Sequence, residues 1–130
     1  MRINFDSVKP IYVQVAEAIE DDIVVGRLRE GEPVYSQLVL SRELNINPAT
    51  AAKGINLLVQ KGILEKQRGL SMTVAAGAKK HIISNTLQKE FTATVSALVE
   101  QGAKIGLSKE EVLRTIDDVF SNWERGNQDE

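Results

Sequence analysis

The amino-acid sequence predicts a mainly α-helical protein that contains one small β-hairpin. Of its 130 residues, 42% are hydrophobic but only 5% are aromatic, so the core must consist of aliphatic side chains, which helices pack well. Apolar residues recur at helical spacing along most of the chain, whereas residues 63–74 read as two short extended segments joined by a glycine turn. The change to purely helical periodicity near residue 75 predicts two contiguous parts, residues 1–75 and residues 76–130.

Length and composition exclude several classes of protein. The chain has room for one ordinary domain, or for a small domain with an appended module. It has no cysteine, which excludes a disulfide framework and a thiol nucleophile. Its only histidine, His81, has no second histidine or cysteine with which to bind a transition metal, so we expect no metal and no cofactor. Because the sequence has neither a secretion signal nor an apolar run near the roughly 18 residues of a membrane span, we expect a cytoplasmic protein without a membrane partner.

The first helix is predicted to run from Pro10 to about Gly26. Proline suits the first turn of a helix, because its missing N–H has no intrahelical partner there. Apolar side chains then recur at every fourth residue, namely Ile11, Val15, Ile19 and Ile23. The same helix carries four acidic residues that we interpret as a solvated face: Glu17, Glu20, Asp21 and Asp22.

Two further helices are predicted from the residues at their ends. Ser36 can cap a short second helix that runs to about Leu44, and Asn45 suits a left-handed helix end. Asn47-Pro48 predicts the start of a third helix, because it combines an N-cap oxygen with a proline at the first helical position. This helix is predicted to end at Lys61-Gly62. Its inward stripe consists of Ala51, Ile55, Leu58 and Val59.

A hairpin and two longer helices complete the predicted fold. Residues 63–67 and 71–74 are the extended segments, and Gly69 allows a tight turn with Arg68 at its tip. Residues from about 76 to 103 have the pattern of a long amphipathic helix, and Ser108 with Glu111 has the form of a capping box for a last helix. The apolar faces of these two helices carry Ile83, Leu87, Phe91, Val95, Leu98, Val112, Ile116, Phe120 and Trp123.

This order of elements is that of a winged helix-turn-helix followed by a two-helix tail. In that fold the third helix packs one face on its neighbours and presents the other to a DNA major groove about 12 Å wide. Its leading end would bring Asn47, Thr50 and Lys53 to phosphates or base edges, and Arg68 would lie along a phosphate or in a narrow minor groove. The net charge of −2 gives no bulk signal for nucleic acid, but residues 36–75 hold five basic against two acidic side chains.

Four stretches of the first part form a set: Pro10-Ile11-Tyr12 with Gln14, Gly26-Arg27-Leu28 with Gly31, Asn47-Pro48-Ala49-Thr50, and Gly62-Ile63-Leu64 with Arg68-Gly69. In this set, residues 10–75 resemble the DNA-binding domain of the GntR family of bacterial transcription regulators. Residues 76–130 are similar in length and helix content to the tail of the YtrA-like subfamily, which dimerises. The resemblance implies a DNA-binding regulator of transcription that acts as a homodimer.

Some positions depart from the family pattern. Leu38 stands where the family usually has an arginine before the second helix, and Gln37 is a partial substitute. Tyr12 and Tyr35 are interpreted as packing residues, because single-strand binders need several exposed aromatic side chains along one groove. The DNA contacts that the resemblance implies are Ser36, Asn47, Thr50, Lys53, Arg68 and Gly69, with Arg42 and Lys66 as further phosphate contacts.

The tail predicts a second copy of the chain as a partner. Its apolar stripe would be a large wet patch on a monomer, whereas a twofold dimer would cover it and present two third helices to a near-palindromic operator. We therefore expect a homodimeric repressor that occupies double-stranded promoter DNA. An unidentified small-molecule effector would bind between the domains or at the dimer interface.

The sequence also bears on two other classes of function. A winged helix can also serve as a protein-interaction or assembly module that does not bind DNA, and Leu38 together with the slightly acidic composition favours that alternative. An enzyme is not expected. The sequence has no glycine-rich phosphate loop, no nucleophile with a base and an acid at motif spacing, and no metal-ligand cluster.

Overall fold

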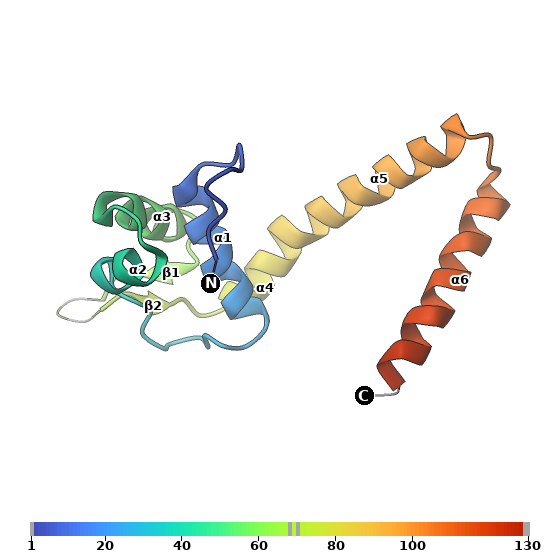
Figure 1. The fold of residues 1–130 in the computed structure, drawn as a ribbon. Coiled ribbons are helices and arrows are strands. Elements are labelled where there is room, and N and C mark those ends of the chain that lie inside the picture. The colour runs from blue at the N-terminus through green and yellow to red at the C-terminus, as the bar shows by residue number, and fades with distance from the viewer. Residues whose placement is uncertain (1, 68, 70, 129–130) are drawn as a thin grey trace. The chain divides into compact units, whose positions relative to one another are not determined.

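The computed structural model describes residues 2–67, 69 and 71–128, and Figure 1 shows its elements. The chain forms two compact units, Met1–Leu87 and Gln88–Glu130. The first unit contains α1 (Ile11–Val24), α2 (Gln37–Leu44), α3 (Pro48–Gln60), β1 (Leu64–Glu65), β2 (Thr73–Val74), α4 (Ala78–Ile82) and the π-helical turn η1 (Ile83–Leu87). The second contains α5 (Gln88–Lys104) and α6 (Lys109–Gln128). The predicted class, mainly helical with one small antiparallel sheet, is confirmed.

The ends of α2 and α3 follow the three terminal signals in the sequence. The Ser36 hydroxyl accepts a hydrogen bond from the Val39 N–H at 3.2 Å, and Asn45 takes the left-handed conformation at φ 54°. The Asn47 side chain then accepts the Ala49 N–H at 2.8 Å, with Pro48 at the first helical position. The Ser36 and Asn47 side chains each satisfy a free N–H at a helix start, Pro48 removes one, and Asn45 ends α2 with its own N–H donated to the Ser41 carbonyl. Together these signals fix the turn between the two helices.

The core of the first unit lies where α1 crosses α3. Gly54 makes this contact possible, because a Cβ atom there would lie 2.8 Å from the Tyr12 carbonyl oxygen and 2.9 Å from the Val15 Cβ. The core also takes in the second helix, the sheet and α4. Its largest fully buried side chains are Ile19, Leu40, Leu58, Ile63, Leu64, Ile82, Val15 and Val74.

Glu20 corrects the interpretation of the acidic residues of α1. The sequence placed it on a solvated face, but the side chain is only 4% exposed, and the Lys61 ammonium lies 3.9 Å from its Oε1 atom. Lys61 follows the last turn of α3, so the crossing of α1 and α3 brings this cation over the carboxylate. A buried carboxylate needs such a nearby positive charge to offset the loss of hydration.

The wing contains more pairing than the two predicted strands. β1 and β2 pair antiparallel in the register Leu64↔Val74, and both are shorter than the predicted segments. Residues 31–34 lie along β2: the Gly31 N–H donates to the Val74 carbonyl and the Val34 N–H to the Met72 carbonyl, each at 2.8 Å. The segment between α1 and α2 therefore lies alongside β2 as a third, strand-like part of the wing.

The predicted helix of residues 76–103 is divided by the π-helical turn. Ile82 is buried in the core of the first unit, and Leu87 is partly buried against the same core. The packing units thus divide after Leu87, whereas the sequence placed its boundary near residue 75. Leu87, which the sequence assigned to a dimer interface, packs in part against this core, and its place in a dimer interface stays a prediction. The units are defined by packing and not by function. The assignment of DNA binding to residues 1–75 and dimerisation to residues 76–130 therefore stays a prediction.

The second unit consists of α5 and α6, joined by a turn in which Gly106 has φ 80°. The predicted capping of α6 is present: the Ser108 hydroxyl accepts the Glu111 N–H at 3.2 Å and donates to the Glu111 carboxylate at 3.2 Å. Near the turn the helices approach closely, since a Cβ on Gly102 would lie 3.0 Å from Val112 Cγ2. Within the described part of the chain, no helix is both long and apolar enough to cross a membrane.

Candidate nucleic-acid interface

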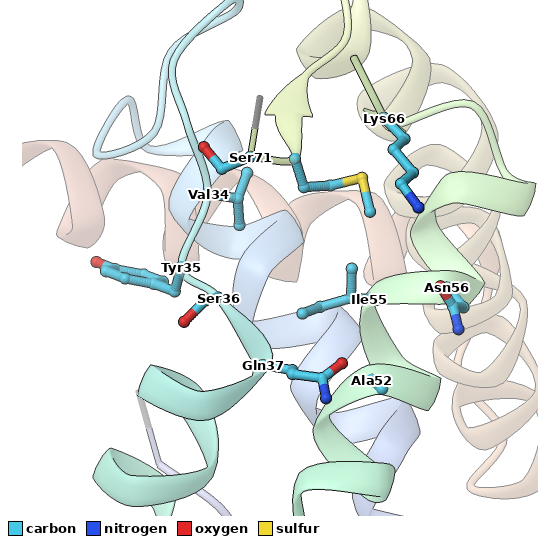
Figure 2. A pocket seen from close by; sticks show the side chains of 10 residues that line it. Val34, Tyr35, Ser36, Gln37, Ala52, Ile55, Asn56, Lys66 and Ser71 are labelled. Atoms are coloured by element: carbon cyan, nitrogen blue, oxygen red, sulfur yellow. The ribbon is translucent and has the colours of Figure 1, made fainter. Parts of the chain in front are cut away.

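A groove of about 270 Å³ lies where the start of α2, the exposed side of α3 and the wing meet (Figure 2). Its floor is apolar, with Val34 and Ile55 buried, and its rim is polar. Figure 2 shows Gln37 beside Ala52, and Lys66 reaching from the wing toward Asn56 on α3. The groove is lined by Val34, Tyr35, Ser36, Gln37, Ala52, Ile55, Asn56, Lys66, Ser71 and Met72.

A second hollow, of about 520 Å³, lies on the other flank of α3. Ala52 and Asn56 line both hollows, so they form a ridge along the exposed side of the helix. The small side chains of this ridge allow a ligand to approach the helix backbone closely. The second hollow is lined by Tyr12, Ala49, Ala52, Lys53, Asn56, Leu57 and Gln60.

Lys53 does not extend freely into solvent. Its ammonium nitrogen lies 4.1 Å from the centroid of the Tyr12 ring, which is cation–π geometry. The contact joins the first turn of α1 to the second turn of α3, and it explains why Tyr12 is half-buried. The sequence predicted Tyr12 as a packing residue, and the lysine partner adds a polar role that residue spacing did not indicate.

The structure brings only some of the predicted DNA contacts to these hollows. Ser36 and Lys66 line the groove, and Lys53 lines the second hollow. Asn47 and Thr50 lie at the leading end of α3, where the Asn47 side chain is engaged as a cap and Thr50 is half-buried. They line neither hollow.

The remaining predicted contacts lie away from the groove or outside the described residues. Arg42 is exposed on the last turn of α2. Gly69 has φ 75°, as the predicted tight turn requires, but Arg68 and Leu70 lie outside the described residues. Leu38, which replaces the usual family arginine, is 55% exposed and does not line the groove. Gln37, the suggested substitute, does line it.

Ala52 and Asn56 are the ridge residues that were not singled out from the sequence as contacts. Exposed or half-exposed residues of α3 recur at helical spacing, and this pattern would have indicated the ridge. The positions in question are Ala49, Ala52, Lys53, Asn56 and Gln60.

The charges around the two hollows favour an anionic ligand. Among the residues that line them, Lys53 and Lys66 are basic and none is acidic. Lys61 is engaged with Glu20 instead. Among the described residues, no group of three or more histidine, cysteine or acidic side chains is placed to hold a metal ion. The chemistry available at the ridge is therefore amide, hydroxyl and ammonium hydrogen bonding.

The second unit presents a different kind of surface. A groove of about 470 Å³ runs between α5 and α6, and it is lined by Phe91, Thr94, Val95, Leu98, Thr115, Ile116, Val119, Phe120 and Trp123. Phe91 is 68% exposed and Trp123 is 63% exposed. Six of the predicted interface residues lie in this groove, and Val112 lines a neighbouring hollow of about 190 Å³ with Leu98. Ile83 and Leu87 belong to the first unit.

Comparison with known proteins identifies related sequences. The family model described as bacterial regulatory proteins, gntR family, matches residues 11–74. The chain is 30% identical over 113 residues to YhcF of Bacillus subtilis, an uncharacterized HTH-type transcriptional regulator, across 87% of this chain and 92% of that protein. It is also 23% identical to the HTH-type transcriptional repressor YtrA of Bacillus subtilis, across 100% of this chain and 99% of that protein.

Solved structures extend the likeness to both units. A transcriptional regulator of the GntR family from Bacteroides thetaiotaomicron matches with 26% identity and a TM-score of 0.71, covering 87% of this chain and 98% of that chain. S. agalactiae BusR in complex with its busA-promotor DNA matches with 26% identity and a TM-score of 0.53. That match covers 86% of this chain and 57% of BusR.

Proposed function

Because this chain belongs to the gntR family of bacterial regulatory proteins, which are DNA-binding regulators of transcription, we propose that the α3 ridge enters the major groove of an operator. The observation that carries the proposal is the ridge itself, with a basic side chain in the hollow on each flank. An α-helix fits the DNA major groove, and phosphates lie on both sides of that groove. The helix and its two flanks therefore match the surface that they would contact.

The ridge residues and the polar residues of the two hollows have different roles in this proposal. Ala52 and Asn56 face the base edges. The Ala52 methyl group suits apolar contact with a thymine methyl, and the Asn56 amide can form two hydrogen bonds with the major-groove edge of adenine. Ser36 and Lys66 contact phosphates on the wing side, and Lys53 contacts a phosphate on the α1 side. Asn47, Thr50, Arg42, Arg68 and Gly69 remain predicted contacts along the same backbone.

The apolar groove of the second unit supports a homodimer. A monomer seldom exposes a contiguous apolar patch of this extent, and a second copy would cover Phe91, Phe120 and Trp123. Twofold symmetry would then direct two α3 ridges to a near-palindromic operator. Such a dimer, bound at a promoter, represses transcription by occupying it.

The regulator works in the cytoplasm, where the promoter is, and an effector that weakens operator binding would relieve repression. The related YtrA is a repressor, which supports this sign of regulation. The alternative of a winged-helix interaction module without DNA binding is disfavoured by the likeness to BusR, whose structure contains promoter DNA.

The experiment starts by selecting genomic fragments that the full-length protein binds, which yields the operator and its half-site spacing. Fluorescence anisotropy then measures operator affinity at several salt concentrations for the wild type, Lys66→Met and Lys109→Met. Each variant removes one positive charge, but Lys109 belongs to α6 of the second unit and lines neither hollow of α3. Affinity falls as salt rises, so the slope of log affinity against log salt is negative. We expect Lys66→Met to make this slope shallower by about 1 for each contacting protomer.

Lys109→Met should keep the wild-type slope, because its charge contacts no phosphate in the proposed complex. Equal slopes for all three proteins would refute the phosphate contact of Lys66. Failure to select any duplex, while the protein retains a bound protein partner, would support the interaction-module alternative.

A further inference from the structure

The Pro10-Ile11-Tyr12 motif with Gln14 has no direct place in the proposed DNA contacts, yet the structure builds a specific arrangement around it. The Gln14 side chain accepts the Asn4 N–H at 2.8 Å and donates to the Asn4 and Lys9 carbonyls, each at 2.9 Å. Pro10 provides no side-chain cap. The Gln14 amide therefore holds the preceding segment against the first turn of α1, the turn that contains Tyr12.

Tyr12 also lies against α3, at Gly54 and Lys53. At Gly54 the absence of a side chain allows the Tyr12 carbonyl to approach so closely that a Cβ would lie 2.8 Å away. Lys53, the residue before this glycine, consequently lies beside the Tyr12 ring. Its ammonium is found 4.1 Å from the ring centroid. The close crossing of the helices thus sets the position of this pair.

A cation over an aromatic face keeps part of its hydrogen-bonding capacity. An ammonium group has three N–H donors, and a ring face engages only one side of it, so the outer side remains able to bind an anion. A free lysine side chain, in contrast, loses rotamer entropy when it is immobilised. A lysine already held over a ring has lost part of this entropy before the ligand arrives.

We propose that Tyr12 is a positioning residue for DNA binding, which holds the Lys53 ammonium over its ring so that it meets an operator phosphate on the α1 side of the ridge. This inference rests on the proposed function, because it needs Lys53 to contact DNA. It assigns to the tyrosine of the motif a role in affinity through Lys53. Tyr12 itself makes no contact with the operator.

The test is a double-mutant cycle on the full-length protein with the selected operator. Anisotropy titrations measure the dissociation constants of wild type, Tyr12→Leu, Lys53→Met and the double variant, with Tyr12→Phe as the matched control. Tyr12→Leu should weaken binding by about 2- to 5-fold for each half-site, the equivalent of an exposed cation–π contact. Tyr12→Phe keeps the ring and should bind like the wild type. In the Lys53→Met background, Tyr12→Leu should have no further effect.

Three outcomes overturn the inference in distinguishable ways. If Tyr12→Leu weakens binding equally with and without Lys53, Tyr12 acts only on the fold. If Tyr12→Leu binds like the wild type while Lys53→Met is weaker, Lys53 contacts DNA without help from the ring. If Lys53→Met binds like the wild type while Lys66→Met is weaker, the contact at Lys53 is absent although the proposed function holds.

A second measurement remains informative even if Tyr12→Leu does not fold. In the free wild-type protein, the ring current of Tyr12 should shift the NMR signals of the Lys53 ε-methylene protons upfield. The same shift should be seen in Tyr12→Phe. Lys53 signals at ordinary lysine positions in both proteins would show that the side chain is not held over the ring, and the proposal would be wrong.

Discussion

The two units of the protein treat their apolar residues in opposite ways. In the first unit, side chains from α1, α3 and the sheet close over one another, and residues such as Ile19 and Leu58 have no exposed surface. In the second unit, the large apolar residues of α5 and α6 remain open, with Phe91 68% and Phe120 57% exposed. Both units carry comparable helix-end signals, since Ser36 caps α2 and Ser108 caps α6.

The difference shows that a helix can be specified locally while its packing is not completed within the chain. Caps and periodicity are sufficient to define α6, but large side chains of its apolar face, such as Val119, Phe120 and Trp123, stay exposed in the described part of the chain. Most of the stability of protein helices comes from tertiary packing of such a face. The stability of the second unit should therefore depend on association, whereas that of the first should not.

The largest expected effect tests the closed core. Leu58→Ala should lower the free energy of unfolding by about 2–5 kcal/mol, because it leaves a cavity among fully buried neighbours. Urea denaturation followed by circular dichroism measures it, and the loss should not vary with protein concentration. Val8→Ala is the control, since Val8 is fully exposed. A loss below about 0.5 kcal/mol for Leu58→Ala, the usual range for surface substitutions, would contradict the closed core.

The next effect tests the open groove. Phe120→Ala should weaken self-association by at least about 30-fold, the equivalent of an interface hot spot of about 2 kcal/mol. Sedimentation equilibrium measures the dimer dissociation constant directly. The melting temperature of the wild type should also rise with protein concentration, as expected when the associated form is the stable one.

The matched control for this experiment is Thr92→Ala, a truncation on α5 outside the groove. Thr92 is exposed, and its hydroxyl donates only to the Gln88 carbonyl of its own helix. It should leave the dissociation constant within about 2-fold, as a surface substitution does. A wild type that sediments as a monomer at every concentration would remove the basis for the dimer.

A smaller change in stability is expected when one glycine in each unit is replaced by alanine. Gly54→Ala should cost about 1–3 kcal/mol, because the new methyl would overlap the Tyr12 carbonyl and Val15. Gly126→Ala in α6 should instead stabilise the protein by up to about 1 kcal/mol, since no atom lies near its Cβ position and alanine favours the helix. Thermal denaturation of both variants gives the signs. A Gly54→Ala variant as stable as the wild type, or more stable, would contradict the close crossing of α1 and α3.

The smallest effect concerns the two serine caps. Ser36→Ala and Ser108→Ala should each cost about 1 kcal/mol, since each removes an acceptor for a free N–H. Only Ser36→Ala should also weaken operator binding, because Ser36 lies at the groove. Denaturation and anisotropy on the same preparations separate the two readouts. An equal loss of operator affinity in both variants would argue against a DNA contact by Ser36.

The sequence predicted the helix ends of the first unit well, because these ends depend on local chemistry. Asn45 and Asn47-Pro48 act through their own backbone and the next few residues, so no distant contact can mislead their interpretation. The same holds for the capping box of α6. The order of elements, and with it the fold class, followed from these local signals.

What the sequence did not predict depends on residues far apart in the chain. Glu20 looked solvated until the crossing of α1 and α3 placed Lys61 beside it, and Tyr12 gained Lys53 through the same crossing. Gly31 and Pro33 are turn residues, so the sequence of residues 31–34 indicates a connection, although their backbone pairs with β2. Contact partners of this kind require the three-dimensional packing.

That pairing has a further consequence for how the protein tolerates change. Because residues 31–34 are tied to β2, the distance between the wing and the first turn of α2 is set by a backbone ladder. An extra residue between Val34 and Ser36 would shift Gln37 out of register with Ala52. Insertions before Gly31 would instead bulge into solvent. Insertions and deletions should accordingly be tolerated before residue 31 and should disrupt the site after residue 34.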